Sequence, residues 1–121
     1  MKKIALIVAE FHPDITEALL KSAEKALQEH HGSSDQYTVV RVPGAFEIPF
    51  AAARLADTKQ YDGLIALGCV IKGETDHYEA VCQGVSYGIQ KVSIEARIPV
   101  MLGVLMCQTK AQALARLQKG Y

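Results

Sequence analysis

Four short apolar runs divide the chain, and each is too short to form a buried helix. Residues 4–9 are apolar at every position, which is typical of a parallel strand covered on both faces. Residues 37–42 are rich in β-branched side chains, and residues 63–70 and 99–105 form two further runs. The pattern therefore predicts four β-strands, the first of them central in its sheet.

Helical patterns alternate with these runs, and three apolar stripes begin at Ile15, Ile48 and Tyr78. Asp14 and Glu17 can satisfy early N–H groups of the first helix, and Thr109 with Gln112 has the spacing of a capping box for a fourth helix. Short connections between strand and helix favour right-handed parallel crossovers. We therefore predict one doubly wound α/β domain over residues 1–121.

The charge is balanced, since 13 basic residues offset 13 acidic ones and no run of like charge is longer than Lys2-Lys3. This excludes the basic footprint of a protein that binds nucleic acid or a membrane surface. The first apolar run ends at Glu10 without a signal-peptide cleavage site, and no stretch is long enough to span a bilayer. We expect a cytoplasmic protein whose partners are small molecules or copies of itself.

Three cysteines, Cys69, Cys82 and Cys107, lie in or beside apolar segments. This indicates reduced, mostly buried thiols rather than a disulfide framework or a metal cluster. A sheet of four strands also leaves edges and apolar faces that usually need a partner, so we expect the chain to associate with itself.

Candidate chemistry follows three of the predicted strands. Phe11 follows the first and Glu47 the second, and residues 68–78 join the third to a helix that begins near His77. Because the carboxyl ends of parallel strands share one edge of a sheet, an aromatic face, a carboxylate and an imidazole can converge there. Such a set suits a planar polar ring that carries an anion.

Each of these residues also has a structural interpretation. Phe11 is explained as well by a place in the core, where aromatic side chains usually lie. Glu47 could cap the second helix instead of binding hydroxyl groups. The helix dipole disfavours the cationic form of His77 and leaves an imidazole able to accept and return protons, but a capping role is the simpler explanation.

Residues 73–75 offer successive N–H groups and a hydroxyl before the third helix, although the spacing of a Walker loop is absent. Arg116 could be no more than a solvated charge, as most such arginines are. A basic group from a neighbouring subunit would complete a phosphate site, because N–H groups alone rarely neutralise a dianion.

Three motifs together carry a family resemblance: VPGAFEIP at 42–49, GCVIKGET at 68–75 with His77, and residues 99–105 followed by Gln112, Ala113 and Arg116. In this order and spacing they closely resemble the lumazine synthase family of riboflavin biosynthesis. The resemblance implies a flavodoxin-like layered α/β/α sandwich with a four-stranded parallel sheet. It also implies assembly into pentamers, decamers or icosahedral shells of sixty subunits, with active sites between subunits and riboflavin synthase as a further partner.

The family reaction is a transferase-type condensation of 5-amino-6-(D-ribitylamino)uracil with 3,4-dihydroxy-2-butanone 4-phosphate, without metal or organic cofactor. By resemblance, Phe11 would stack on the pyrimidine ring, and the backbone of Val70 and Ile71 would bind its polar edge. The ribityl chain would be held by Ala45, Phe46 and Glu47. His77 would shuttle protons during imine formation and phosphate elimination. The phosphate would be bound by Gly73, Glu74 and Thr75 and by Arg116 of the adjacent subunit.

The chain departs from the family pattern at several positions. His12 stands where asparagine is common, and Leu102 where many members have a phenylalanine that helps to wall the pyrimidine pocket. Residues 107–108 replace a threonine pair, and we expect the last C-terminal helix of the family to be lacking. The alternative is therefore a shell-forming or flavin-binding member with weakened catalysis. A receiver-type signalling domain is disfavoured, because the third strand ends in Gly68-Cys69 rather than in an acidic residue.

Overall fold

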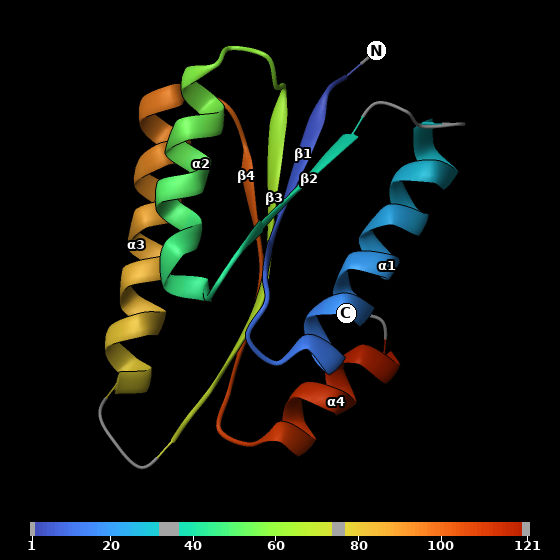
Figure 1. The fold of residues 1–121 in the computed structure, drawn as a ribbon, viewed down its shortest axis with the longest axis vertical. Helices are drawn as coiled ribbons and strands as arrows, with labels where there is room; N and C mark the ends of the chain where they lie inside the picture. Colours follow the sequence, from blue (N-terminus) through green and yellow to red (C-terminus); the bar gives the residue numbers. More distant parts are fainter. Residues whose placement is uncertain (1, 32–36, 74–76, 120–121) are drawn as a thin grey trace.

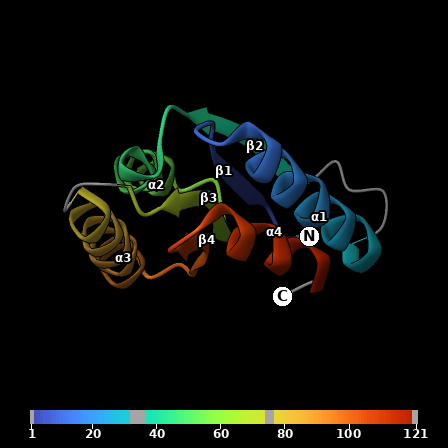
Figure 2. The same cartoon turned by 90° about the horizontal axis from the view of Figure 1, so that it is seen from below.

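The computed structural model describes residues 2–31, 37–73 and 77–119. Its elements are, in chain order, β1 (Ile4–Ala9), α1 (Pro13–His31), β2 (Tyr37–Val42), the 3₁₀ helix η1 (Ala45–Glu47), α2 (Ile48–Asp57), β3 (Gly63–Ile71), α3 (His77–Ala96), β4 (Val100–Cys107) and α4 (Lys110–Lys119). The four strands are parallel and lie in the order β2-β1-β3-β4. Helices α2 and α3 cover one face of this sheet, and α1 and α4 cover the other (Figures 1 and 2).

This arrangement confirms the predicted α/β sandwich and its parallel sheet. After β1 the chain winds outward to β2, and after α2 it returns to β3 on the other side of β1. In such sheets ligands bind beyond the carboxyl ends of the strands, where the winding changes direction. In this chain that point lies between β1 and β3.

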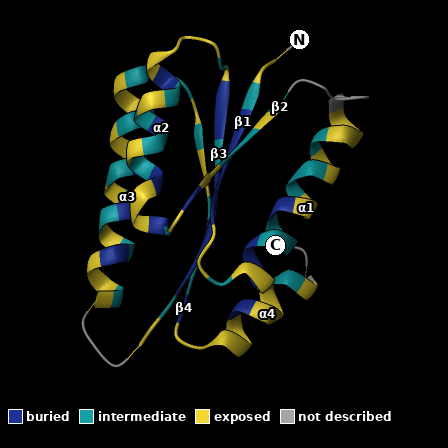
Figure 3. Ribbon diagram, viewed as in Figure 1, coloured by how far each residue is buried: buried dark blue, intermediate teal, exposed yellow. Residues whose placement is uncertain are grey.

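The core lies on both faces of β1, as its unbroken apolar run predicts. Residues 5 to 9 are at most 1% exposed (Figure 3). Ala5, Ile7 and Ala9 pack with the side chains beneath α2 and α3, whereas Leu6 and Val8 pack with those beneath α1. Because β1 is buried on both faces, it also fixes the positions of β2 and β3, the two strands that pair with it.

Helices α2 and α3 pack closely because α3 has glycine where they meet. A Cβ atom added at Gly88 would lie 2.6 Å from Pro49 Cβ and 2.7 Å from Pro49 Cγ. One added at Gly84 would lie 2.6 Å from Phe46 Cε1. The two glycines therefore let η1 and the start of α2 approach the middle of α3.

The predicted capping box of α4 is confirmed. The Gln112 N–H donates to Thr109 Oγ1 over 3.2 Å, and the Thr109 N–H donates in return to Gln112 Oε1 over 3.4 Å. The same oxygen accepts a hydrogen bond of 2.7 Å from the Gln108 N–H. The capping role predicted for Glu17 is wrong, because its carboxylate accepts hydrogen bonds from the Arg41 guanidinium on β2. That partner lowers the pKa of Glu17, just as Lys110 on α4 lowers the pKa of Asp14.

The part of the chain that the structure describes contains no helix long and apolar enough to cross a membrane. Within the same residues, no three His, Cys, Asp or Glu side chains gather closely enough to hold a metal ion. The three cysteines are free thiols, of which Cys69 and Cys107 are buried and Cys82 is half-buried.

Candidate active site

A cavity of about 520 Å³ lies at the carboxyl ends of the strands. Its walls come from the β1–α1, β2–α2 and β3–α3 connections, which the sequence predicts to converge. The lining residues are Phe11, His12, Pro43, Gly44, Ala45, Phe46, Glu47, Cys69, Val70, Ile71, His77, Ala80 and Val81. This volume is in the usual range for a site that binds a small molecule.

Phe11 lies in the wall of this cavity and is 68% exposed, so the interpretation of Phe11 as a core residue is wrong. Its N–H donates to the Pro43 carbonyl over 3.1 Å, and the preceding Glu10 N–H donates to Val42 over 2.9 Å. These bonds continue the pairing of β1 with β2 beyond the last residues of both strands. They hold the Phe11 backbone at the cavity and leave its ring open to a ligand.

The 3₁₀ helix η1 brings three residues to the cavity in different ways. Within η1, the Ala45 side chain is buried, whereas Phe46 is 58% exposed. The Glu47 N–H donates to Gly44 over 3.1 Å, but the Glu47 carboxylate makes no capping hydrogen bond to α2. The capping interpretation of Glu47 is therefore wrong, and its carboxylate lies in the cavity wall.

The end of β3 supplies backbone to the cavity. Pairing of β3 with β1 ends at Leu67, opposite Val8, whereas its pairing with β4 continues to Ile71, opposite Cys107. In Figure 1, β3 continues below the end of β1. Val70 and Ile71 line the cavity, and in the described part of the chain no strand pairs with them on the β1 side. Their backbone can therefore form hydrogen bonds with a ligand there.

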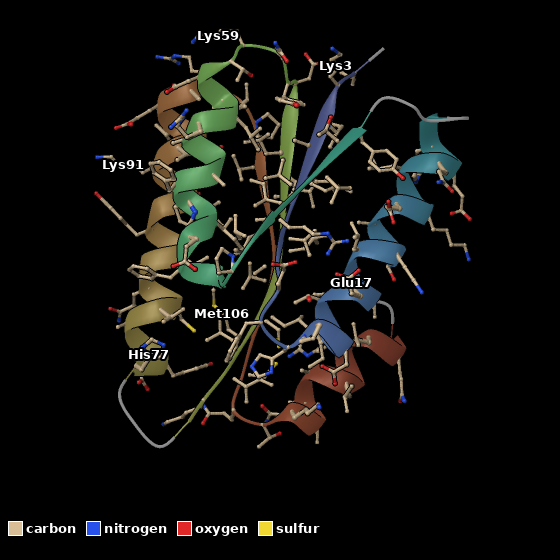
Figure 4. All side chains as sticks on the ribbon, in the orientation of Figure 1. Lys3, Glu17, Lys59, His77, Lys91 and Met106 are labelled. Carbon is tan, nitrogen blue, oxygen red and sulfur yellow. The ribbon has the colours of Figure 1, made fainter. Side chains whose placement is uncertain are left out.

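His77 is the first residue of α3 (Figure 4) and lines the same cavity. Ala80 and Val81 follow it at helical spacing and line the same cavity. The His77 side chain is exposed, so a bound ligand would be within its reach. The cavity thus combines an aromatic face, a strand edge, a carboxylate and an imidazole.

Several predicted site residues do not line this cavity. Leu102 lies in the middle of β4 opposite Ala66 and is 51% exposed, and Arg116 is an exposed residue of α4. Gly73 is exposed, and apart from its chain neighbours no atom of the described residues lies within 4 Å of a Cβ placed on it. Glu74 and Thr75 lie outside the described residues.

Sequence reasoning placed His12 and Gly44 at the converging strand ends, and both line the cavity. It assigned no role to four other residues that the structure brings there: Pro43, Cys69, Ala80 and Val81. The positions of Ala80 and Val81 three and four residues after His77 were a usable signal, because such residues share a helix face. The place of Cys69 in the cavity wall could not have been predicted, since a buried thiol in a strand is typical of a core residue.

Cys69 gives a prediction for alkaline pH. Burial, with smaller contributions from Cys107 and Asp14, raises the pKa of the Cys69 thiol from 9.0 to about 11. Between these values the unfolded chain releases this proton and the folded chain keeps it, so stability falls as pH rises. The shift corresponds to about 2–3 kcal/mol, which urea titrations at pH 8 and above can measure.

The control for this prediction is Cys69→Ala, which should show a smaller loss of stability between pH 9 and 11 than the wild type. The Cys69 thiol should also react slowly with iodoacetamide at pH 8, because little thiolate is present. If the stability of Cys69→Ala and of the wild type depended equally on pH, the loss of stability could not be assigned to the Cys69 thiol.

Comparison with known proteins identifies the family. The family described as 6,7-dimethyl-8-ribityllumazine synthase matches residues 1–121. A relative of that name from Coxiella burnetii (strain Dugway 5J108-111) is 47% identical over 94% of this chain and 76% of its own length. Relatives of the same name from Pediococcus pentosaceus and Porphyromonas gingivalis are 46% and 43% identical over 94% of this chain, and 73% and 71% of their lengths. The chain therefore belongs to the 6,7-dimethyl-8-ribityllumazine synthase family.

Proposed function

We propose that the protein condenses 5-amino-6-(D-ribitylamino)uracil with 3,4-dihydroxy-2-butanone 4-phosphate to give 6,7-dimethyl-8-ribityllumazine, phosphate and water. One observation carries the proposal beyond the name of the family. A single cavity brings together Phe11, the edge of β3, Glu47 and His77, which are the chemical groups that this reaction needs.

The pyrimidine would bind between Phe11 and the end of β3. Its planar face stacks on the exposed Phe11 ring, and its ring N–H and carbonyl groups meet the backbone of Val70 and Ile71. This is supported by the lack of a neighbouring strand on that side of β3. Backbone groups held in a strand need no rearrangement to bind the ring, which keeps the cost of binding low.

The ribityl chain would extend from the pyrimidine along η1. Its hydroxyl groups can donate to the Glu47 carboxylate, which the helix α2 does not use as a cap. The exposed Phe46 ring would cover the carbon chain. A carboxylate that accepts several hydroxyl hydrogen bonds distinguishes a polyol from an apolar substituent of the same size.

The reaction requires proton transfer at successive steps, and His77 would carry it out. The amino nitrogen of the pyrimidine attacks the butanone carbonyl, and water leaves to form an imine. Removal of a proton from carbon then allows phosphate to depart, and ring closure releases water again. An imidazole beside the reacting atoms can take up and return these protons, and positioning the two substrates supplies much of the remaining acceleration.

We propose that the site is shared between subunits. Gly73, Glu74 and Thr75 would bind the phosphate together with Arg116 of a neighbouring copy, while Leu102 of that copy would wall the pyrimidine. Large apolar side chains remain exposed on α3 and β4, namely Tyr87, Ile94, Met101 and Leu102, which supports association into pentamers or larger shells. Full turnover by a protein that native mass spectrometry shows as monomer only would contradict this.

Fluorescence of the lumazine product tests the function directly. The purified chain with both substrates should give the product, and omission of either substrate should abolish it. Phosphate release, measured separately, should match lumazine formation in amount. Tight riboflavin binding without any lumazine would contradict the proposal and favour a flavin-binding member of the family.

A further inference from the structure

His12 occupies an unusual backbone conformation at the edge of the cavity. Its φ is 63°, in the left-handed region that residues with a Cβ atom seldom adopt, and it precedes Pro13, which normally restricts the preceding residue to extended conformations. The His12 carbonyl accepts hydrogen bonds of 3.0 Å from the N–H groups of Ile15 and Thr16. The turn at His12 therefore ends the connection that follows β1 and begins α1.

The same residue makes contact with the aromatic ring of the site. The rings of His12 and Phe11 have centroids 4.8 Å apart and planes inclined at 72°, an edge-to-face pair. Both side chains line the cavity, and the Phe11 ring is otherwise largely exposed. The backbone of Phe11 is fixed by its bond to Pro43, but that bond does not determine the plane of the ring.

We propose that His12 is a positioning residue, whose imidazole fixes the plane of the Phe11 ring so that a planar substrate can stack on it. The inference rests on the proposed function only for the identity of that substrate. A phenyl ring held by its backbone alone can still turn about χ2, and each turn away from the stacking plane removes contact area. Edge-to-face contact with His12 favours one orientation before the ligand arrives, and this preorganisation improves affinity.

The sharpest variant is His12→Asn, because asparagine tolerates a positive φ and lacks the ring. His12→Gly, which also permits this backbone conformation, serves as a second variant. Calorimetric titration with 5-amino-6-(D-ribitylamino)uracil should give a dissociation constant about threefold to tenfold higher for both variants. In turnover assays KM for the pyrimidine should rise, while KM for the butanone phosphate and kcat should stay near the wild-type values.

A double-mutant cycle separates positioning from direct contact. In a Phe11→Leu background, His12→Asn should change the dissociation constant by less than about twofold, because the ring that His12 orients is gone. An equal effect of His12→Asn in both backgrounds, or no effect in either, would overturn the proposal. So would an equal rise in KM for both substrates, which indicates general damage to the site.

The environment of the Phe11 ring can be measured by ¹⁹F NMR without any substrate. This tests the role of His12 separately from the proposed reaction. The chain contains three phenylalanines, so labelling with 4-fluorophenylalanine gives few ¹⁹F signals, and Phe11→Leu identifies one of them. His12→Asn should move the Phe11 signal and leave that of Phe50, which lies on α2 near Arg54, in place. If this shift occurs but the wild type forms no lumazine, the proposed function fails and the positioning role stands. An unmoved Phe11 signal would refute the role of His12.

Discussion

Replacing His77 with alanine is expected to lower kcat for lumazine formation by about 10²-fold. A positioned acid–base group typically contributes about 10²- to 10⁴-fold. The lower end applies because, in the proposed mechanism, the cavity of the variant still positions both substrates. Since the His77 side chain is exposed at the start of α3, its removal leaves no buried void in the core. Steady-state fluorescence assays at saturating substrate measure the effect.

His30→Ala is the matched control, because His30 is also an exposed histidine of a helix but lies near the C-terminal end of α1, outside the cavity. It should retain wild-type kcat. Added imidazole should restore part of the rate of His77→Ala if the missing function is proton transfer. Turnover by His77→Ala within about twofold of the wild type would remove His77 from the proposed mechanism, whatever the value of KM.

The fold could be predicted from the sequence because its signals are local. A strand such as β1, buried on both faces, has to be apolar at every position, and the structure places it in the centre of the sheet. The capping box of α4 depends on residues three positions apart and is equally visible. Glu17 was misassigned because its partner, Arg41, comes from another strand, and helical spacing carries no information about that neighbour.

The site was predicted less completely, and the reason is again physical. Topology alone brings the ends of β1, β2 and β3 to one edge, so the convergence of Phe11, Glu47 and His77 follows from the order of the elements. Whether Phe11 is buried depends on how its backbone leaves β1, which composition does not encode. The role inferred for Arg116 concerns a neighbouring subunit, and Leu102, which the resemblance assigns to the wall of the pyrimidine pocket, does not line the cavity of its own chain.

The packing of α2 against α3 leads to the second large expected effect. Gly88→Ala should lower the free energy of unfolding by about 1–3 kcal/mol, although alanine is the better helix former by about 1 kcal/mol. The added methyl group would lie 2.6 and 2.7 Å from two carbons of the Pro49 ring. That ring cannot rotate away, and it belongs to the first turn of α2, so the helix itself would have to move. Urea titrations followed by circular dichroism, at one fixed protein concentration, measure the change.

Gly84→Ala is the matched control, because the same substitution on the same helix meets a different kind of neighbour. Its methyl group would lie 2.6 Å from Phe46 Cε1, on a ring that is 58% exposed and able to turn outward. Stability should therefore remain within about 1 kcal/mol of the wild type, since the gain in helix propensity offsets the contact. KM for the ribityl substrate should nevertheless rise, because Phe46 lines the cavity.

The two glycines thus separate the stability of the helix pair from the shape of the site. If Gly88→Ala is as stable as the wild type, the close approach of α2 to α3 is not what holds η1 at the cavity. If Gly84→Ala loses as much stability as Gly88→Ala, the Phe46 ring is held as rigidly as Pro49. The exposed Phe46 ring would then be a rigid part of the wall of the substrate site. The ribityl chain would bind to a surface that is already formed before the substrate arrives.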